Sequence, residues 1–65
     1  MPTYRCFFLS DEGRLLDVTF RECFDDIDAL TWAEQCSRQD LMFKKIEIWL
    51  DGLLIGTRQR VVRDA

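Results

Sequence analysis

KKIEIWLDGLLIG, residues 44–56, is the stretch that decides the fold. Two apolar runs meet at Asp51-Gly52, a pair that favours the two-residue type I′ turn of a β-hairpin because both residues tolerate positive φ. The first run alternates, so Ile46, Ile48 and Leu50 share one face of a strand. Trp49 must then project from the other face. The stretch predicts a hairpin over residues 45–50 and 53–62, and it leaves open what covers Trp49.

A second hairpin is predicted towards the N-terminus. Residues 3–9 are rich in aromatic side chains, and Gly13 supplies the positive φ that a short loop needs. Residues 14–24 alternate, with an apolar face and a polar face. The apolar face carries Leu16, Val18 and Phe20, and the polar face carries Asp17, Thr19 and Arg21.

A helix is predicted between the hairpins, over about residues 26–38. Asp25-Asp26 offers a carboxylate to cap its start, where the helix dipole also favours acidic residues. Small residues dominate the apolar side, so the helix can lie close to a sheet. That side carries Ala29, Leu30, Ala33, Cys36 and Ser37, with Trp32 at its edge, and the loop over 37–43 is expected to place Leu41, Met42 or Phe43 beneath the domain.

This order predicts a single α+β domain over residues 1–65, a ββαββ fold in which one helix packs on one face of a four-stranded antiparallel or mixed sheet. The strand order stays open. Parallel central strands one and four would resemble ubiquitin-like or protein G-like domains, whereas a pairing of strands one and three makes the sheet wholly antiparallel. The uncovered face then receives, from strand one, either Tyr4, Cys6 and Phe8 or Arg5, Phe7 and Leu9.

Length and composition limit how such a domain is stabilised. A chain of 65 residues buries only about 60% of the surface that it exposes when unfolded, and domains of this size usually need a disulfide, a metal, oligomerisation or unusually good packing. Three cysteines and no secretory segment indicate a reduced, cytoplasmic protein. The absence of histidine and of a C-x-x-C pair argues against zinc. No apolar run approaches a membrane span of about 20 residues. Oligomerisation or good packing remains.

The sequence offers little for catalysis. It has no histidine, no G-x-S-x-G and no glycine-rich phosphate loop. Its paired carboxylates, Asp11-Glu12 and Asp25-Asp26, are explained by a turn and a helix cap. We therefore expect no enzyme activity and no cofactor. We expect Cys6 and Cys36 to be buried, and Cys23, beside Glu22 at the end of a strand, to be more exposed and the most easily oxidised.

The charges are unevenly distributed. Residues 1–43 hold four arginines and nine acidic residues (−5), whereas residues 44–65 hold five basic and three acidic residues (+2), which sum to the net −3. A net acidic chain repels nucleic-acid phosphates, so general nucleic-acid binding is disfavoured. The arginines of the C-terminal run form either a solvated edge that discourages strand addition or a docking site for the acidic half of a second chain or for an anionic ligand.

The chain resembles a group of small uncharacterised bacterial proteins, common in alphaproteobacteria, that share this ββαββ layout. The resemblance rests on YRCFFL, on a short loop ending in DEGR, on the acidic helix start and on IEIWLDGLLI. It covers nearly the whole chain and implies the fold. It implies no activity, because these motifs are hairpin and core positions.

The sequence thus favours a small, non-catalytic interaction or scaffold module that forms a homodimer through the uncovered sheet face. The residues expected to make contacts are Trp49, Phe7, Arg58 and Arg60. One alternative is a nucleic-acid-binding regulator that uses Lys44, Lys45, Arg58, Arg60 and Arg63. Another is a small-ligand carrier around Trp49. A third explanation for Trp49 itself is shelter under residues 41–43 of a strongly twisted sheet.

Overall fold

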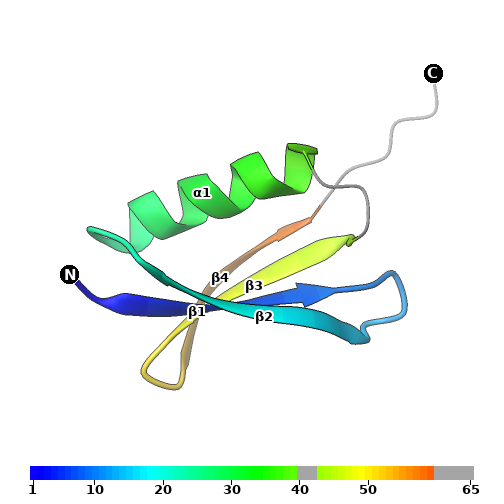
Figure 1. The fold of residues 1–65 in the computed structure, drawn as a ribbon, viewed down its shortest axis with the longest axis horizontal. Coiled ribbons are helices and arrows are strands. Elements are labelled where there is room, and N and C mark those ends of the chain that lie inside the picture. The colour runs from blue at the N-terminus through cyan, green and yellow to red at the C-terminus, as the bar shows by residue number, and fades with distance from the viewer. Residues whose placement is uncertain (40–42, 60–65) are drawn as a thin grey trace.

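The computed structural model describes residues 1–39 and 43–59, which form four strands and one helix. In chain order these are β1 (Thr3–Leu9), β2 (Leu15–Glu22), α1 (Asp26–Gln39), β3 (Lys45–Leu50) and β4 (Leu53–Gln59). The strands make one antiparallel sheet in the order β2-β1-β3-β4, and α1 packs on one of its faces (Figure 1). The predicted α+β ββαββ fold is confirmed. Of the two strand orders left open, β1 meets β3 and the sheet is wholly antiparallel.

Both hairpin loops have the backbone that their sequences predict. Asp51 and Gly52 adopt φ values of 51° and 82°, as a type I′ turn requires. In the first hairpin Gly13 has a φ of 79°, its N–H donates to the Ser10 carbonyl at 2.9 Å, and the Ser10 N–H donates to the Arg14 carbonyl at 2.9 Å. Local turn chemistry therefore fixes the register of each hairpin. The predicted strand residues 60–62 lie outside the described residues, as do Leu41 and Met42.

Two hydrogen bonds between side-chain carboxylates and backbone N–H groups cap the start of α1. The Asp28 N–H donates to Asp25 Oδ1 at 2.8 Å, and the Phe24 N–H donates to Asp28 Oδ2 at 3.0 Å. The Tyr4 hydroxyl of β1 donates to Asp26 Oδ1 at 2.7 Å, which ties the first turn to the sheet. The predicted cap is confirmed. At the other end, α1 ends at Gln39, one residue beyond the predicted end near residue 38, so the loop that was expected over 37–43 begins later.

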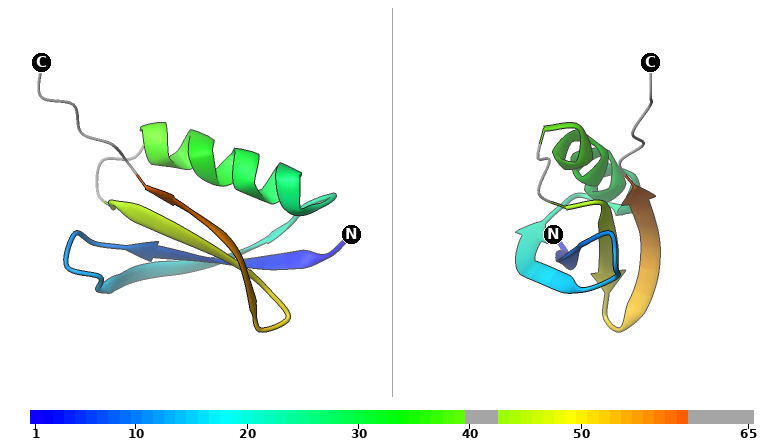
Figure 2. Two further views of the ribbon diagram at one scale, coloured as in Figure 1. Left: turned by 180° about the vertical axis from the view of Figure 1, so that it is seen from behind. Right: turned by 90° about the vertical axis from the view of Figure 1, so that its right-hand side faces the viewer.

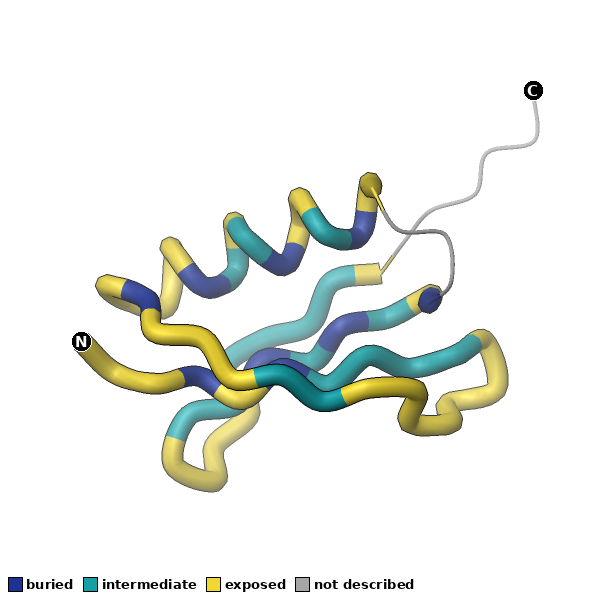
Figure 3. The backbone as a smooth tube through the Cα atoms, in the orientation of Figure 1, coloured by how far each residue is buried: buried dark blue, intermediate teal, exposed yellow. Residues whose placement is uncertain are grey.

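The core lies between α1 and the two central strands (Figure 3). Ala29 and Ala33 of α1 are buried against Ile46 and Ile48 of β3. On β1, Tyr4 and Cys6 are buried on the helix side of the sheet. Side chains alternate along a strand, so Phe7 lies on the opposite face. Within residues 1–39 and 43–59 the buried residues are Tyr4, Cys6, Cys23, Ala29, Ala33, Ser37, Phe43, Ile46 and Ile48.

The helix lies off-centre, mainly over β3 and β4. Gly56 of β4 permits this approach, because a Cβ at that position would lie only 2.8 Å from Leu30 Cδ2. Strand β2 lies at the other edge of a strongly twisted sheet (Figure 2). From that edge the Arg21 guanidinium reaches the Trp32 ring, 5.0 Å from its centroid. One helix therefore covers only part of one face of the sheet.

Gly52→Ala should destabilise the domain by about 1 kcal/mol or more, because alanine is strained at a positive φ. The measurement is urea unfolding followed by circular dichroism. Asp51→Asn is the matched control and should be close to neutral, since asparagine tolerates this region. Equal stabilities for Gly52→Ala and the wild type would contradict the turn geometry.

Candidate interaction surface

The sheet face opposite α1, here called the open face, carries a row of side chains that crosses all four strands. Residues paired across antiparallel strands share a face. Trp49 pairs with Leu54 on one side and Arg5 on the other, and Arg5 pairs with Phe20. In the next row, Phe7 lies between Val18 and Glu47. The prediction that Trp49 projects away from the helix is confirmed.

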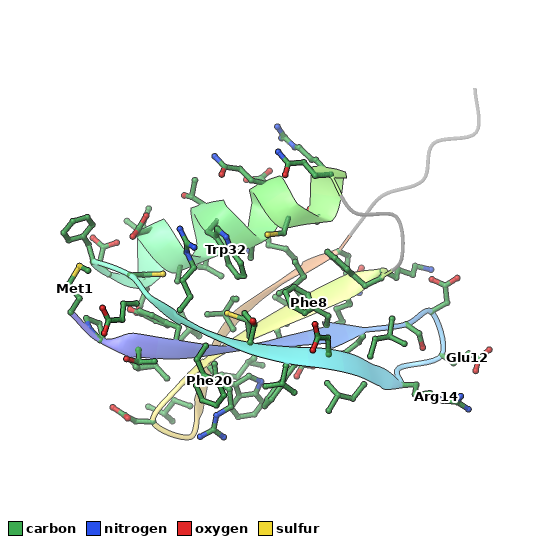
Figure 4. All side chains as sticks on the ribbon, in the orientation of Figure 1. Met1, Phe8, Glu12, Arg14, Phe20 and Trp32 are labelled. Carbon is green, nitrogen blue, oxygen red and sulfur yellow. The ribbon has the colours of Figure 1, made fainter. Side chains whose placement is uncertain are left out.

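The apolar side of β2 belongs to this open face. Figure 4 shows Phe20 on the side of the sheet turned away from α1, whereas Phe8 and Trp32 lie between sheet and helix. Phe20 is 64% exposed and Leu54 is exposed too, while Phe7, Val18 and Trp49 are half-buried. The alternation that looked like the core side of a hairpin therefore produces an exposed apolar surface. Such surfaces on small domains mark interaction sites when they are contiguous.

Contacts among neighbouring side chains hold the aromatic residues of this face in place. The rings of Phe7 and Trp49 lie with centroids 6.2 Å apart, tilted by 59°. Trp49 Nε1 donates to Glu47 Oε1 at 3.1 Å, and Glu47 Oε2 lies 3.6 Å from Lys45 Nζ. The Arg5 guanidinium lies 5.7 Å from the centroid of the Phe20 ring. The face thus combines fixed aromatic rings with charges of both signs.

Trp49 is not sheltered by Phe43, the described residue among those considered for this role. Phe43 is buried on the helix side, where its ring centroid lies 4.9 Å from that of Phe8. Trp49 and Phe8 occupy opposite faces of the sheet, so Phe43 cannot cover the indole. The other residues considered for this role, Leu41 and Met42, lie outside the described residues.

Both edges of the sheet carry a charged side chain folded onto its own strand. The Cys23 N–H points towards the N-terminal segment, because it donates to the Pro2 carbonyl. Backbone groups alternate in direction along a strand, so the N–H and C=O of Val18, five residues earlier, point away from β1. The Val18 N–H donates to Asp17 Oδ1 at 2.8 Å. On β4, Arg58 Nη1 donates to the Thr57 carbonyl at 2.8 Å. Each contact occupies one outward backbone group and so disfavours strand addition at that point of the edge.

The structure describes three of the four residues predicted to make contacts, and it separates Arg58 from the other two. Trp49 and Phe7 are neighbours on the open face. Arg58 pairs with the buried Ile46, so it lies on the helix side of β4. Arg60 lies outside the described residues, with Arg63.

Sequence reasoning missed Phe20 and Leu54 as members of this surface, whereas Arg5 belongs to one of the two strand-one sets that it left open for the uncovered face. The alternation of residues 14–24 was the available signal for Phe20. It became informative only once β1 was known to lie between β2 and β3.

The thiols differ from expectation. Cys6 is buried as predicted, but Cys23 is buried too, and the expectation that it is exposed is wrong. Its N–H bonds to Pro2, which holds the chain against the N-terminal segment. Cys36 is half-buried, not buried. Burial raises the pKa of Cys6 to about 11, and burial also raises the pKa of Cys23. Both groups are therefore protonated thiols near neutral pH.

Residues 1–39 and 43–59 contain no group of three or more histidine, cysteine, aspartate or glutamate side chains placed to hold a metal ion. In the same part of the chain, no helix is long and apolar enough to cross a membrane. Comparison with protein-family models, with curated proteins and with solved structures finds no match to this chain. The surface must therefore be interpreted from its own geometry.

Cys6 and Cys23 should resist alkylation by iodoacetamide at pH 8 in the native state, because little thiolate is present and both are buried. Modification should begin at the half-buried Cys36. Mass spectrometry with peptide mapping measures this, with a urea-unfolded sample as the control in which all three cysteines react. Rapid native labelling of Cys23 would contradict the burial found here.

The stabilising contribution of Tyr4 should be lost at high pH, when its hydroxyl ionises. The hydrogen bond to the Asp26 carboxylate, with burial, raises its pKa from 10.0 to about 12. Between these values the folded chain keeps the phenol proton and the unfolded chain releases it. The contribution of Tyr4 to stability is thus complete below about pH 10 and is lost as the pH rises towards 12.

Tyr4 is the single tyrosine, so absorbance at 295 nm follows its ionisation. Urea unfolding of the wild type and of Tyr4→Phe across this pH range isolates its effect from that of lysines and thiols. Parallel pH profiles for the two proteins would contradict the proposed linkage.

Proposed function

We propose that this chain is a small, non-catalytic interaction module that forms a two-fold homodimer through its open face. The observation that carries the proposal is that Phe20 and Leu54 are exposed on the same sheet face as Phe7 and Trp49, opposite the only helix among the described residues. A second copy presents the same patch, so one surface serves both chains in an isologous contact.

The size of the face supports this proposal. Four strands about 4.8 Å apart, each of six to eight residues rising about 3.3 Å per residue, span roughly 15 Å by 20–25 Å. This projected area is roughly 300–375 Å², about half of the roughly 600–800 Å² that specific interfaces bury on each partner, and the side chains standing on it supply further accessible surface.

Charge also favours a second copy as the occupant. Arg5 and Lys45 place positive charge on the open face, and Glu47 places negative charge there. A two-fold axis through the patch can bring Arg5 of one copy towards Glu47 of the other, so the face is self-complementary. Like-signed faces would repel.

The occupied edge groups of Val18 and Thr57 support a closed dimer over sheet extension. The protonated thiols of Cys6 and Cys23 accord with a reducing cytoplasm. The proposal assigns no catalytic residue and no cofactor.

Phe20→Ser should weaken dimerisation by at least about a hundredfold, because each of the two copies loses a phenylalanine whose burial contributes about 1.5–3 kcal/mol. Trp49→Ala should weaken it as well. The measurement is sedimentation velocity over a range of concentrations, with matched circular dichroism spectra. Leu53→Ser is the matched control. Leu53 is 69% exposed and pairs with Leu50 on the helix side, so its loss should leave the dimer unchanged.

A wild-type chain that stays monomeric at several hundred micromolar would overturn the proposal. Salt-sensitive retention of an oligonucleotide would then assign the face to nucleic acid. Quenching of fluorescence by an aromatic metabolite, abolished in Trp49→Phe, would assign it to a small ligand. Loss of fold in Trp49→Ala would return this residue to the core, and Phe20→Ser would remain the test of the dimer.

A further inference from the structure

A second exposed apolar surface lies at the start of α1, and we call it the helix-entry patch. It consists of Phe24, which is 78% exposed, Ile27, which is 75% exposed, and Met1, which is also exposed. The bond from the Cys23 N–H to the Pro2 carbonyl brings the N-terminal segment beside Phe24, and Figure 1 shows the N-terminus next to the start of the helix. This patch is separate from the open face, because its residues belong to the helix entry and not to the sheet.

Phe24 has no partner at the place where such a residue usually finds one. With Asp25 as the N-cap, Phe24 occupies the position that normally packs on the fourth residue of the helix. That residue is Ala29, whose methyl group is buried in the core. The ring therefore stays in solvent.

The exposure does not come from a loose chain. The Phe24 N–H is bonded to Asp28, the Asp28 N–H to Asp25, and the Asp26 carboxylate to the Tyr4 hydroxyl. The backbone at the patch is thus fixed before any partner arrives. A fixed apolar surface loses little conformational entropy on binding.

Three carboxylates surround the patch, those of Asp25, Asp26 and Asp28. None of them forms an ion pair among the described residues, where the salt bridges are Arg38–Glu34 and Lys45–Glu47. The surface is therefore apolar at its centre and negative around it. A complementary ligand is a peptide segment in which two adjacent apolar residues are flanked by positively charged residues.

The chain itself contains that pattern in Arg60-Val61-Val62-Arg63, which lies outside the described residues. Within one chain these residues cannot reach the patch. Gly56 lies under Leu30, and β4 then runs towards the far end of α1, about 10 Å further by Gln59 (Figures 1 and 2). Val61 is two residues beyond Gln59, so it can lie at most about 7 Å from it. To reach Ile27 it would have to go back the roughly 10 Å to the level of Leu30 and then further, which this span does not allow.

We propose that the helix-entry patch of one copy binds the Arg60–Arg63 segment of a second copy. The contact joins two different surfaces, so it is heterologous and can link successive copies. It is distinct from the two-fold open-face contact and does not depend on it. Because opposite charges contribute, it weakens as salt rises.

The test uses the full chain carrying Phe20→Ser, which weakens the open-face contact. This protein should still associate at 50 mM salt and lose most of that association at 500 mM. Two further variants in this background each disable one side of the contact. Ile27→Lys places a cation on the patch, and the double change Arg60→Glu with Arg63→Glu reverses the charge of the segment. Each should be monomeric alone, with an unchanged circular dichroism spectrum.

An equimolar mixture of these two variants should form a heterodimer of twice the chain mass in sedimentation, because one supplies an intact segment and the other an intact patch. Leu53→Lys in the Phe20→Ser background is the control for adding a cation at an equally exposed site, and it should associate as its parent does. A mixture that remains monomeric would overturn the proposal. So would a Phe20→Ser chain that is already monomeric at 50 mM salt.

Discussion

The close contact between Leu30 of α1 and Gly56 of β4 sets the position of the helix, and the rest of the surface depends on that position. Because Gly56 has no side chain, α1 settles over β3 and β4 and not over the middle of the sheet. Arg21 extends from β2 to the Trp32 ring at the border of the covered area. The sheet therefore has one face that is partly covered and one face without a helix among the described residues.

This arrangement divides the apolar side chains of a short chain between two surfaces. Leu16, Val18 and Phe20 of β2 look like core residues by their alternation, yet their strand lies away from the helix and their face is the open one. Covering an aromatic side chain removes roughly 200 Å² from water, which at about 25 cal/mol per Å² is several kcal/mol before ordering costs. That is comparable to the total stability of about 3–5 kcal/mol expected for so small a core. Covering the exposed part of this face is therefore a favourable term of the same order as the stability of the domain, before the costs of association are subtracted.

Local features of the fold could be predicted from the sequence, and long-range features could not. The Asp51-Gly52 turn and the cap at Asp25 depend on residues within four positions of each other, and both are confirmed. The strand order, the choice between the two faces of β1 and the burial of Cys23 depend on segments that are distant in sequence. Alternation also placed Trp49 correctly, but it could not decide whether Arg5 lies beside it or put Phe20 in the same row. Arg5 pairs with both Trp49 and Phe20 only because β1 lies between β2 and β3.

The edges and the faces of the sheet differ in chemistry, and this contrast bears on the proposed association through the open face. Unpaired backbone groups at an edge are a template for a further strand, but here the outward N–H of Val18 and the outward carbonyl of Thr57 are each occupied by a charged neighbour. On the open face the charges lie beside aromatic rings without covering them, and Phe20 stays mostly exposed. A partner added at an edge must displace a hydrogen bond, whereas a partner on the face displaces water from apolar surface, which is favourable. The same reasoning places Trp49, half-buried beside Phe7, within the surface that a second copy would complete.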